Sequence, residues 1–224
     1  QNIVAYGWKA GGNKNTFNVD DVGFASFAAS GTTAGTITPT GTSIGTKQGF
    51  SIIKYTGSGS AGTIPHGLSD APKLVIIKCL DTNYSWVVGH DAIGWTDILK
   101  LESSDAKLDR TYFNDTAPTN TVVSVSGENS TNKSGENFIM YAWADNPGVQ
   151  KFGSYIGNGN ADGPYITLGF KPALLVYKKT SGGENWQVYD NARNLWNPTN
   201  KRIRLDLNNG QDTGNSCDMY SDGF

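Results

Sequence analysis

An internal repeat constrains the fold of this chain more than any other feature of its sequence. When residues 55–86 are aligned with residues 155–186 without gaps, nine of the 32 positions are identical. Glycine, proline and aromatic residues at fixed positions constrain either the backbone or a core. Such pairs are Gly57 and Gly157, Gly59 and Gly159, Pro72 and Pro172, and Trp86 and Trp186. A period near 100 residues exceeds the roughly 20–50 residues of solenoid repeats, so it indicates tandem copies of a small domain.

A second, shorter repeat relates residues 2–8 to residues 137–143, because both segments carry Asn, Tyr and Trp at the same spacing. Together the two repeats define a unit of about 95 residues that closes with an aromatic strand. We therefore expect residues 1–10 to be the closing strand of an upstream unit and residues 11–48 to be a Thr/Gly-rich linker or an extended arm. Residues 49–145 would form a first unit, and residues 150–224 a second, incomplete one.

The expected strands are short and are separated by turns rich in Gly and Asn. Residues 72–78 and 173–178 are apolar runs of strand length, and each is followed by a polar turn and a second apolar run. This pattern predicts a hairpin in each unit. Residues 121–125 and 138–143 have the composition of further strands, and no segment has the period of an amphipathic helix. The sequence thus predicts an all-β fold of tandem antiparallel β-sandwich units.

Charge and hydropathy exclude two classes of partner. The net charge is −2, whereas a nucleic-acid-binding surface needs clustered Lys and Arg. No apolar run approaches the roughly 18 residues that cross a membrane, so we expect no membrane insertion. The two cysteines, Cys79 and Cys217, are far apart in the chain, and we expect two unpaired thiols rather than a disulfide.

Several motifs of the chain resemble a domain of unknown function that is common in structural proteins of marine tailed bacteriophages. The resemblance covers nearly the whole chain except parts of the segment 11–48. It rests on residues 6–12, 49–59, 66–68, 71–78, 152–164, 169–173 and 190–194.

In that family the domain is often tandem and accompanies concanavalin A-like lectin modules. The resemblance therefore implies sandwich units of jelly-roll or concanavalin A-like type in a virion. It implies other virion proteins as partners, a homo-oligomer such as a trimer, and a role in tail fibre, tail or capsid decoration. It brings no catalytic residue, so we expect no enzyme.

Three functions from different classes follow. The first is a structural protein of a bacteriophage that mediates assembly, attachment to the host surface, or both. The second is a carbohydrate-binding, lectin-like module, which would bind a host surface polysaccharide. The third, least favoured, is a glycan-degrading enzyme, which needs two carboxylates about 5–10 Å apart, and no spacing in the sequence brings such a pair together.

Aromatic residues in loops are the candidates for a sugar-binding site. We expect loops around Trp95 with Asp97, and around Trp196 with Asn194 and Asn197, where an exposed indole could stack on a sugar ring. Packing in a core or an interface is nevertheless the favoured expectation for both tryptophans. Trp86 and Trp186 recur with the repeat and are expected to be buried at equivalent positions.

Other polar motifs favour structural roles. Asn158, Asn160 and Asp162 imitate the first half of a calcium loop, but its acidic twelfth ligand is missing, so a β-turn is the expectation and a weak calcium site the alternative. We expect no other cofactor. His66 and His90 have no nucleophile beside them in the sequence, which favours structural histidines.

The second unit lacks counterparts of the strands expected at residues 122–125 and 138–143. A sheet without them would expose unpaired backbone groups at its edge. Three alternatives would complete it: a chain that continues past residue 224, donation of the strand-like segment 2–8 by this chain or a neighbour, or another virion protein.

Overall fold

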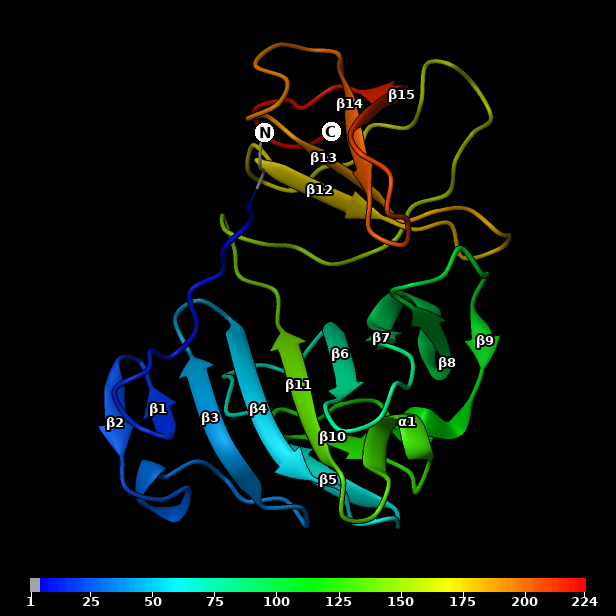
Figure 1. Ribbon diagram of the computed structural model, residues 1–224. Helices are drawn as coiled ribbons and strands as arrows, with labels where there is room; N and C mark the ends of the chain where they lie inside the picture. Colours follow the sequence, from blue (N-terminus) through cyan, green and yellow to red (C-terminus); the bar gives the residue numbers. More distant parts are fainter. Residues whose placement is uncertain (1–4) are drawn as a thin grey trace.

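The computed structural model describes residues 5–224, which fold into three antiparallel or mixed β-sheets (Figure 1). The largest sheet has nine strands in the order β2-β1-β3-β4-β11-β6-β7-β8-β9. Its strands are β1 (Phe17–Val19), β2 (Val22–Phe24), β3 (Pro39–Gly45), β4 (Phe50–Thr56), β6 (Leu74–Cys79), β7 (Val87–His90), β8 (Gly94–Lys100), β9 (Leu108–Asp109) and β11 (Asn137–Trp143). All pairs are antiparallel except β1 with β3.

A two-stranded ribbon covers one face of this sheet. It consists of β5 (Gly62–Pro65) and β10 (Val122–Val125). Side chains on alternate positions of a strand point to the same face, so Ile53, Met140 and Ile77 meet Ile64 and Val123 in one buried cluster. The two layers give the β-sandwich-like core that the alternation predicts.

Short helical turns close the loops of this region. They are the 3-10 turns η1 (Ala28–Ser30), η2 (Asp91–Ile93) and η3 (Thr111–Phe113), and the single-turn helix α1 (Asn129–Asn132). The buried Asn132 side chain holds the neighbouring loop, because its Nδ2 donates to the carbonyl of Ser60 at 2.6 Å and its Oδ1 accepts from the backbone of Ser58 at 2.8 Å. No helix within residues 5–224 is long and apolar enough to cross a membrane.

The remaining chain forms a separate four-stranded sheet above the large one (Figure 1). Its strands, in spatial and chain order, are β12 (Leu174–Tyr177), β13 (Gln187–Asp190), β14 (Thr199–Arg204) and β15 (Asp212–Cys217). Both predicted hairpins are confirmed as β6–β7 and β12–β13, and they pair in the same register: Ile76 lies opposite Val88, and Val176 lies opposite Val188.

The all-β prediction is confirmed, but the structure does not confirm tandem jelly-roll units of about 95 residues. Residues 11–48 do not form a linker, because β3 pairs with β4 and Ile37 and Ile44 are buried in the core. In the other half of the chain, residues 151–156 form no strand, although β4 occupies the corresponding positions at the offset of 100. Of the expected strand at residues 1–10, residues 1–4 lie outside the described range, and residues 5–10 are not a strand.

Candidate functional site

The second face of the large sheet is the candidate functional site, because part of it is apolar and open. Residues of β4, β11 and β6 lie side by side on it in three rows set by the strand register. The first row is Lys54, Ile139 and Lys78, the second is Ile52, Tyr141 and Ile76, and the third is Phe50, Trp143 and Leu74. The face therefore changes from cationic to aliphatic to aromatic along the strands.

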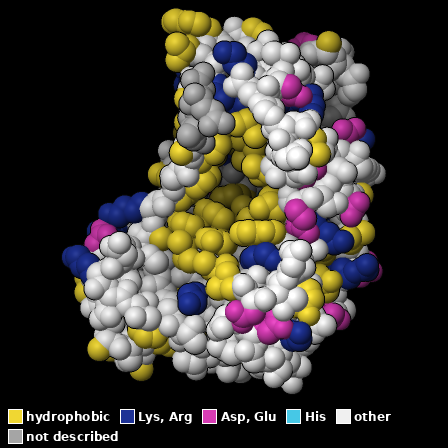
Figure 2. Space-filling model, in the orientation of Figure 1, with side chains coloured by type: hydrophobic (Ala, Val, Ile, Leu, Met, Phe, Trp, Pro, Cys, Tyr) yellow, Lys and Arg dark blue, Asp and Glu magenta, His cyan; other side chains and the backbone are white. Residues whose placement is uncertain are grey.

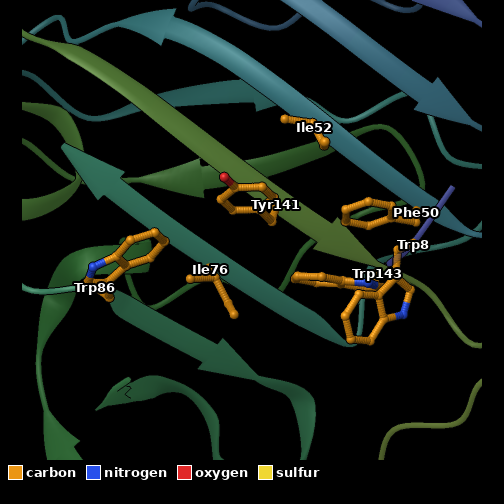
Figure 3. A pocket seen from close by; sticks show the side chains of 7 residues that line it. All are labelled: Trp8, Phe50, Ile52, Ile76, Trp86, Tyr141 and Trp143. Carbon is orange, nitrogen blue, oxygen red and sulfur yellow. The ribbon is translucent and has the colours of Figure 1, made fainter. Parts of the chain in front are cut away.

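A groove with a volume of about 290 Å³ runs over the second and third rows. It is lined by Trp8, Phe50, Ile52, Ile76, Trp86, Tyr141 and Trp143. Figure 3 shows Trp86 at one end of the groove, and Trp8, Phe50 and Trp143 at the other. The same region forms the hollowed, hydrophobic floor between the two parts of the molecule in Figure 2.

Stacked rings fix the aromatic end of the groove. The ring centroids of Phe50 and Trp143 are 4.7 Å apart with planes at 23°, and those of Tyr141 and Trp143 are 6.1 Å apart with planes at 24°. Phe50 and Trp143 are buried, whereas Tyr141 is half-buried. Burial raises the pKa of the Tyr141 hydroxyl, so this group stays protonated and can donate a hydrogen bond.

The segment 5–10 carries Trp8 onto this end. The Trp8 ring meets Trp143 edge-on, with centroids 6.3 Å apart, and remains 48% exposed. Two residues earlier, the Tyr6 hydroxyl donates a hydrogen bond of 2.7 Å to Asp190 of β13, so the segment spans the two sheets (Figure 1). Burial, and then the hydrogen bond to Asp190, raise the pKa of Tyr6 to about 12.

The small sheet closes the face beyond the groove. Trp186 packs in a buried cluster with Val88 and Leu99, and this cluster contacts Leu74 and Ile76. Trp86 borders the end of the groove that lies away from Trp8, Phe50 and Trp143. Its backbone N–H donates to the Glu102 carboxylate at 3.0 Å. Trp86 is thus partly exposed at the groove, whereas Trp186 is 8% exposed. The two residues hold the equivalent positions that the repeat predicts, directly before β7 and β13, and Trp186 is the more buried of the two.

Trp95 is expected in a loop, but the structure places it in a strand. Trp95 lies within β8, is 5% exposed, and packs edge-on against Phe113. Asp97 on the same strand forms an ion pair of 2.6 Å with Lys107. Trp95 is therefore a core residue, as the favoured expectation had it, and its ring is not exposed for stacking on a sugar.

Trp196 does lie in a loop and is 83% exposed. Its two predicted neighbours support the backbone of that loop: Asn194 accepts a hydrogen bond from the Lys201 N–H at 2.8 Å, and Asn197 exchanges two with the backbone of Met219. These amides are already engaged, so the loop presents a single exposed indole rather than a ring with convergent polar groups.

The Asn158 loop has the geometry of successive side-chain turns. The Oδ1 atom of Asn158 accepts from the backbone N–H of Asn160 at 3.0 Å, and that of Asn160 accepts from Asp162 at 3.4 Å. Oxygens directed at the backbone do not converge on an ion. Nowhere in residues 5–224 do three His, Cys, Asp or Glu residues gather in a group suited to a metal.

Both histidines hold backbone groups. His66 is fully buried; its Nδ1 accepts from the Leu68 N–H at 3.1 Å and its Nε2 lies 3.1 Å from the Thr119 carbonyl. His90 caps η2 by accepting the Ala92 N–H at 3.0 Å. Asp91 pairs with Lys73 at 2.9 Å instead of with His90. Both histidines are therefore structural, as predicted, and the two cysteines are free.

The Gly and Pro residues that recur in the repeat share some structural features but differ in others. A Cβ on Gly57 would lie 2.1 Å from the Lys133 carbonyl oxygen, whereas one on Gly157 would meet nothing within 4 Å. Gly59 and Gly159 share a positive φ, at 73° and 70°. Pro72 and Pro172 are both buried, and each lies just before the first strand of its hairpin, β6 and β12 respectively.

Sequence reasoning did not single out the groove residues Trp8, Phe50, Tyr141 and Trp143 as a candidate site. The available signal was the run 138–143, which is apolar on both faces and so predicts a strand with no solvent-facing side. Which face stays uncovered depends on the order of strands, and that order is set by contacts across 60–90 residues.

The fold and the groove define an all-β protein with an open aromatic face. The chain belongs to the family described as "Domain of unknown function (DUF7483)", whose model matches residues 1–224. No curated protein and no solved structure matches the chain.

Proposed function

We propose that this chain is a non-catalytic structural protein of a bacteriophage particle, and that it attaches to its target through the aromatic groove. The virion location rests on the resemblance of its sequence motifs to phage structural proteins. The open face of the large sheet is the observation that supports a binding role. A concave, mostly apolar surface with a few polar groups is the usual form of a binding site.

The groove has the properties of a binding surface rather than of a catalytic centre. Its described lining residues are aromatic or aliphatic, and the hydroxyl of Tyr141 and the indole N–H groups supply its polar atoms. General acid-base and nucleophilic chemistry need a carboxylate, imidazole, amine or thiol at the reacting position. The same set of residues suits contact with flat, partly apolar groups.

Carbohydrate binding is the second candidate, and the placement of Trp8 and Trp86 at opposite ends of the groove favours it. Indole and phenol rings offer apolar faces together with a polar edge, which matches the C–H faces and hydroxyl groups of a sugar ring. The ammonium groups of Lys54 and Lys78 lie one row away, and Lys78 donates to the Tyr84 carbonyl at 2.5 Å. An acidic surface polysaccharide would combine ring contacts with this positive charge.

Immunogold labelling of purified particles with an antibody against this chain tests the virion location. Labelling at one site of the particle supports the proposal, and particles that lack the chain overturn it. The role of the groove is tested separately, by binding of the purified chain to host cells and to isolated host polysaccharide.

Trp86→Ala is the informative variant, because the ring is partly exposed and borders the groove. We expect at least tenfold weaker binding to cells. Trp196→Ala, which removes an exposed indole away from the groove, is the matched control and should bind normally. If both variants bind as the wild type does, the groove is not the attachment surface. If binding to cells survives removal of polysaccharide, carbohydrate is not the target.

A further inference from the structure

The first observation concerns the free edge of the small sheet. The hairpins β6–β7 and β12–β13 have the same register at an offset of 100 residues. In the large sheet, the other edge of β6 is paired along its whole length with β11. The corresponding edge of β12 pairs with no strand in residues 5–224. β12 therefore corresponds to β6, but it lacks the neighbouring strand that β11 provides for β6.

The backbone direction of the free groups follows from the same comparison. The Leu80 N–H donates to the Asn137 carbonyl, so even-numbered residues at this end of β6 direct their backbone groups at β11. At the offset of 100, Leu174 and Val176 direct theirs at the free edge. Val176 is also 42% exposed, so an unpaired N–H, an unpaired carbonyl and an apolar side chain coincide there.

The counterpart of β4, which would lie beyond the missing strand, is also absent from the small sheet. Residues 150–156 align with β4, which in the large sheet flanks β11 on its other side. Residues 151–158 are not in a strand, and the Ile156 side chain is 90% exposed. A β11-like strand beside β12 would give this segment the partner that β4 has.

The chain contains such a strand sequence in addition to β11 itself. Residues 2–8 match residues 137–143 at the Asn, Tyr and Trp positions, and Tyr6 and Trp8 correspond to Tyr141 and Trp143. The described part of this segment makes few contacts: Tyr6 and Trp8 are 37% and 48% exposed, and residues 5–10 belong to no strand. Among residues 5–8, release breaks the side-chain hydrogen bond of Tyr6 to Asp190 and the edge-on contact of Trp8 with Trp143.

We propose that the free edge of β12 accepts the segment 2–8 of a second copy of this chain as an antiparallel strand. The register of β11 on β6 places Trp8 of the incoming segment opposite Leu174, and its Tyr6 opposite Val176. Strand addition of this kind satisfies exposed backbone groups, and alternate side chains set the register. The acceptor edge is separate from the aromatic groove, whereas the donor segment carries Trp8, so donation removes Trp8 from the groove of the donor copy. The proposal rests on the backbone edge of β12 and does not depend on the proposed function.

A second copy fits better than the chain's own segment. In the structure, Tyr6 reaches Asp190 and Trp8 packs on Trp143, so this segment crosses from the small sheet to the large one instead of following β12. An exchanged segment generates a head-to-tail contact, in which each copy offers one donor strand and one acceptor edge. The association then extends from copy to copy.

Two full-length variants separate donor from acceptor. Val176→Pro removes the N–H that faces the free edge and blocks acceptance, while Tyr6→Pro removes the matching N–H of the donor. Val176→Thr keeps the backbone donor and is the matched control. The mass of each protein is measured by light scattering over a range of concentrations, and folding is verified by circular dichroism.

We expect wild type and Val176→Thr to form multimers as concentration rises, and each proline variant alone to remain at the 24.0 kDa of one chain. An equimolar mixture of the two proline variants should form a dimer, because each supplies what the other lacks. A blocked synthetic peptide of residues 2–8 should dissociate wild-type multimers. A wild type that stays monomeric, a Val176→Pro variant that still multimerises, or a mixture without dimers would overturn the proposal.

Discussion

The indole Nε1 of Trp186 donates a hydrogen bond of 2.9 Å to the carbonyl oxygen of Lys100. This bond joins the small sheet to β8 of the large sheet, and the Trp186 ring packs there on Val88 and Leu99. Trp86 holds the equivalent place in the first hairpin, yet it borders the open groove. Trp186 thus joins the two sheets, whereas its counterpart in the repeat, Trp86, borders the groove.

Trp186→Ala should lower the free energy of unfolding by about 3–5 kcal/mol, the range for truncating a large aromatic residue in a core. The ring is 8% exposed and its N–H is satisfied by protein, so both packing and a hydrogen bond are lost. Urea unfolding followed by circular dichroism measures the change. Trp196→Ala removes an indole that is 83% exposed and should change stability by less than about 0.5 kcal/mol. Equal effects of the two substitutions would contradict this assignment.

Gly57→Ala should destabilise the protein by roughly 1–3 kcal/mol, as overpacking does, because the added Cβ would lie 2.1 Å from the backbone oxygen of Lys133. Gly157→Ala is the control from the second copy of the repeat. Its Cβ would meet nothing within 4 Å, so the substitution should be neutral or slightly stabilising. The difference in thermal unfolding midpoint between the two variants checks the prediction, and similar midpoints would show that the close approach at Gly57 relaxes without cost.

Local patterns were sufficient to predict the paired hairpins. The apolar runs that became β6 and β12 are bounded by proline on one side and by polar turns on the other, and this boundary sets strand length without reference to the rest of the chain. The strands β10 and β11 were recognisable from the alternation and strand-like composition of residues 121–125 and 138–143.

Features that depend on distant partners could not be predicted in this way. Residues 11–48 have the composition of a linker, but β3 is stabilised by its pairing with β4, and Ile44 is fully buried by that pairing. Trp95 follows a short turn and has the local sequence of a loop residue, but Phe113 from a later segment covers its ring. The groove likewise exists because β11 inserts between β4 and β6, which no local pattern reveals.

His66 should make stability depend on pH below neutrality. Burial lowers the pKa of its imidazole below the ordinary value of 6.5, and the hydrogen bond to the Thr119 carbonyl opposes this only in part. The unfolded chain therefore binds a proton that the folded chain resists, so stability is full above about pH 6.5 and falls as pH drops below it. His66→Gln should reduce the pH dependence of the thermal unfolding midpoint between pH 7 and pH 5. A midpoint that declines equally in wild type and variant would assign the decline to other groups.

Glu136 should act in a lower pH range. The hydrogen bond from the Cys79 thiol, at 2.9 Å, and the Lys133 ammonium at 2.6 Å lower the pKa of this carboxyl from 4.5 to about 2. A carboxylate with a depressed pKa stabilises the fold above its unfolded pKa, and this stability is lost as pH falls from about 4.5 towards 2. Glu136→Gln keeps the shape of the side chain but cannot titrate.

The test of the Glu136 prediction is the thermal midpoint of wild type and Glu136→Gln between pH 6 and pH 2. The wild type should be the more stable protein at pH 6. The two curves should converge as pH falls towards 2, where the carboxyl is protonated in the unfolded chain and about half protonated in the folded chain. Lys133→Met removes the ion pair but keeps the Cys79 contact, so it should retain part of the pH dependence. Parallel curves for wild type and Glu136→Gln would show that this carboxyl has the same pKa in the folded and unfolded chain.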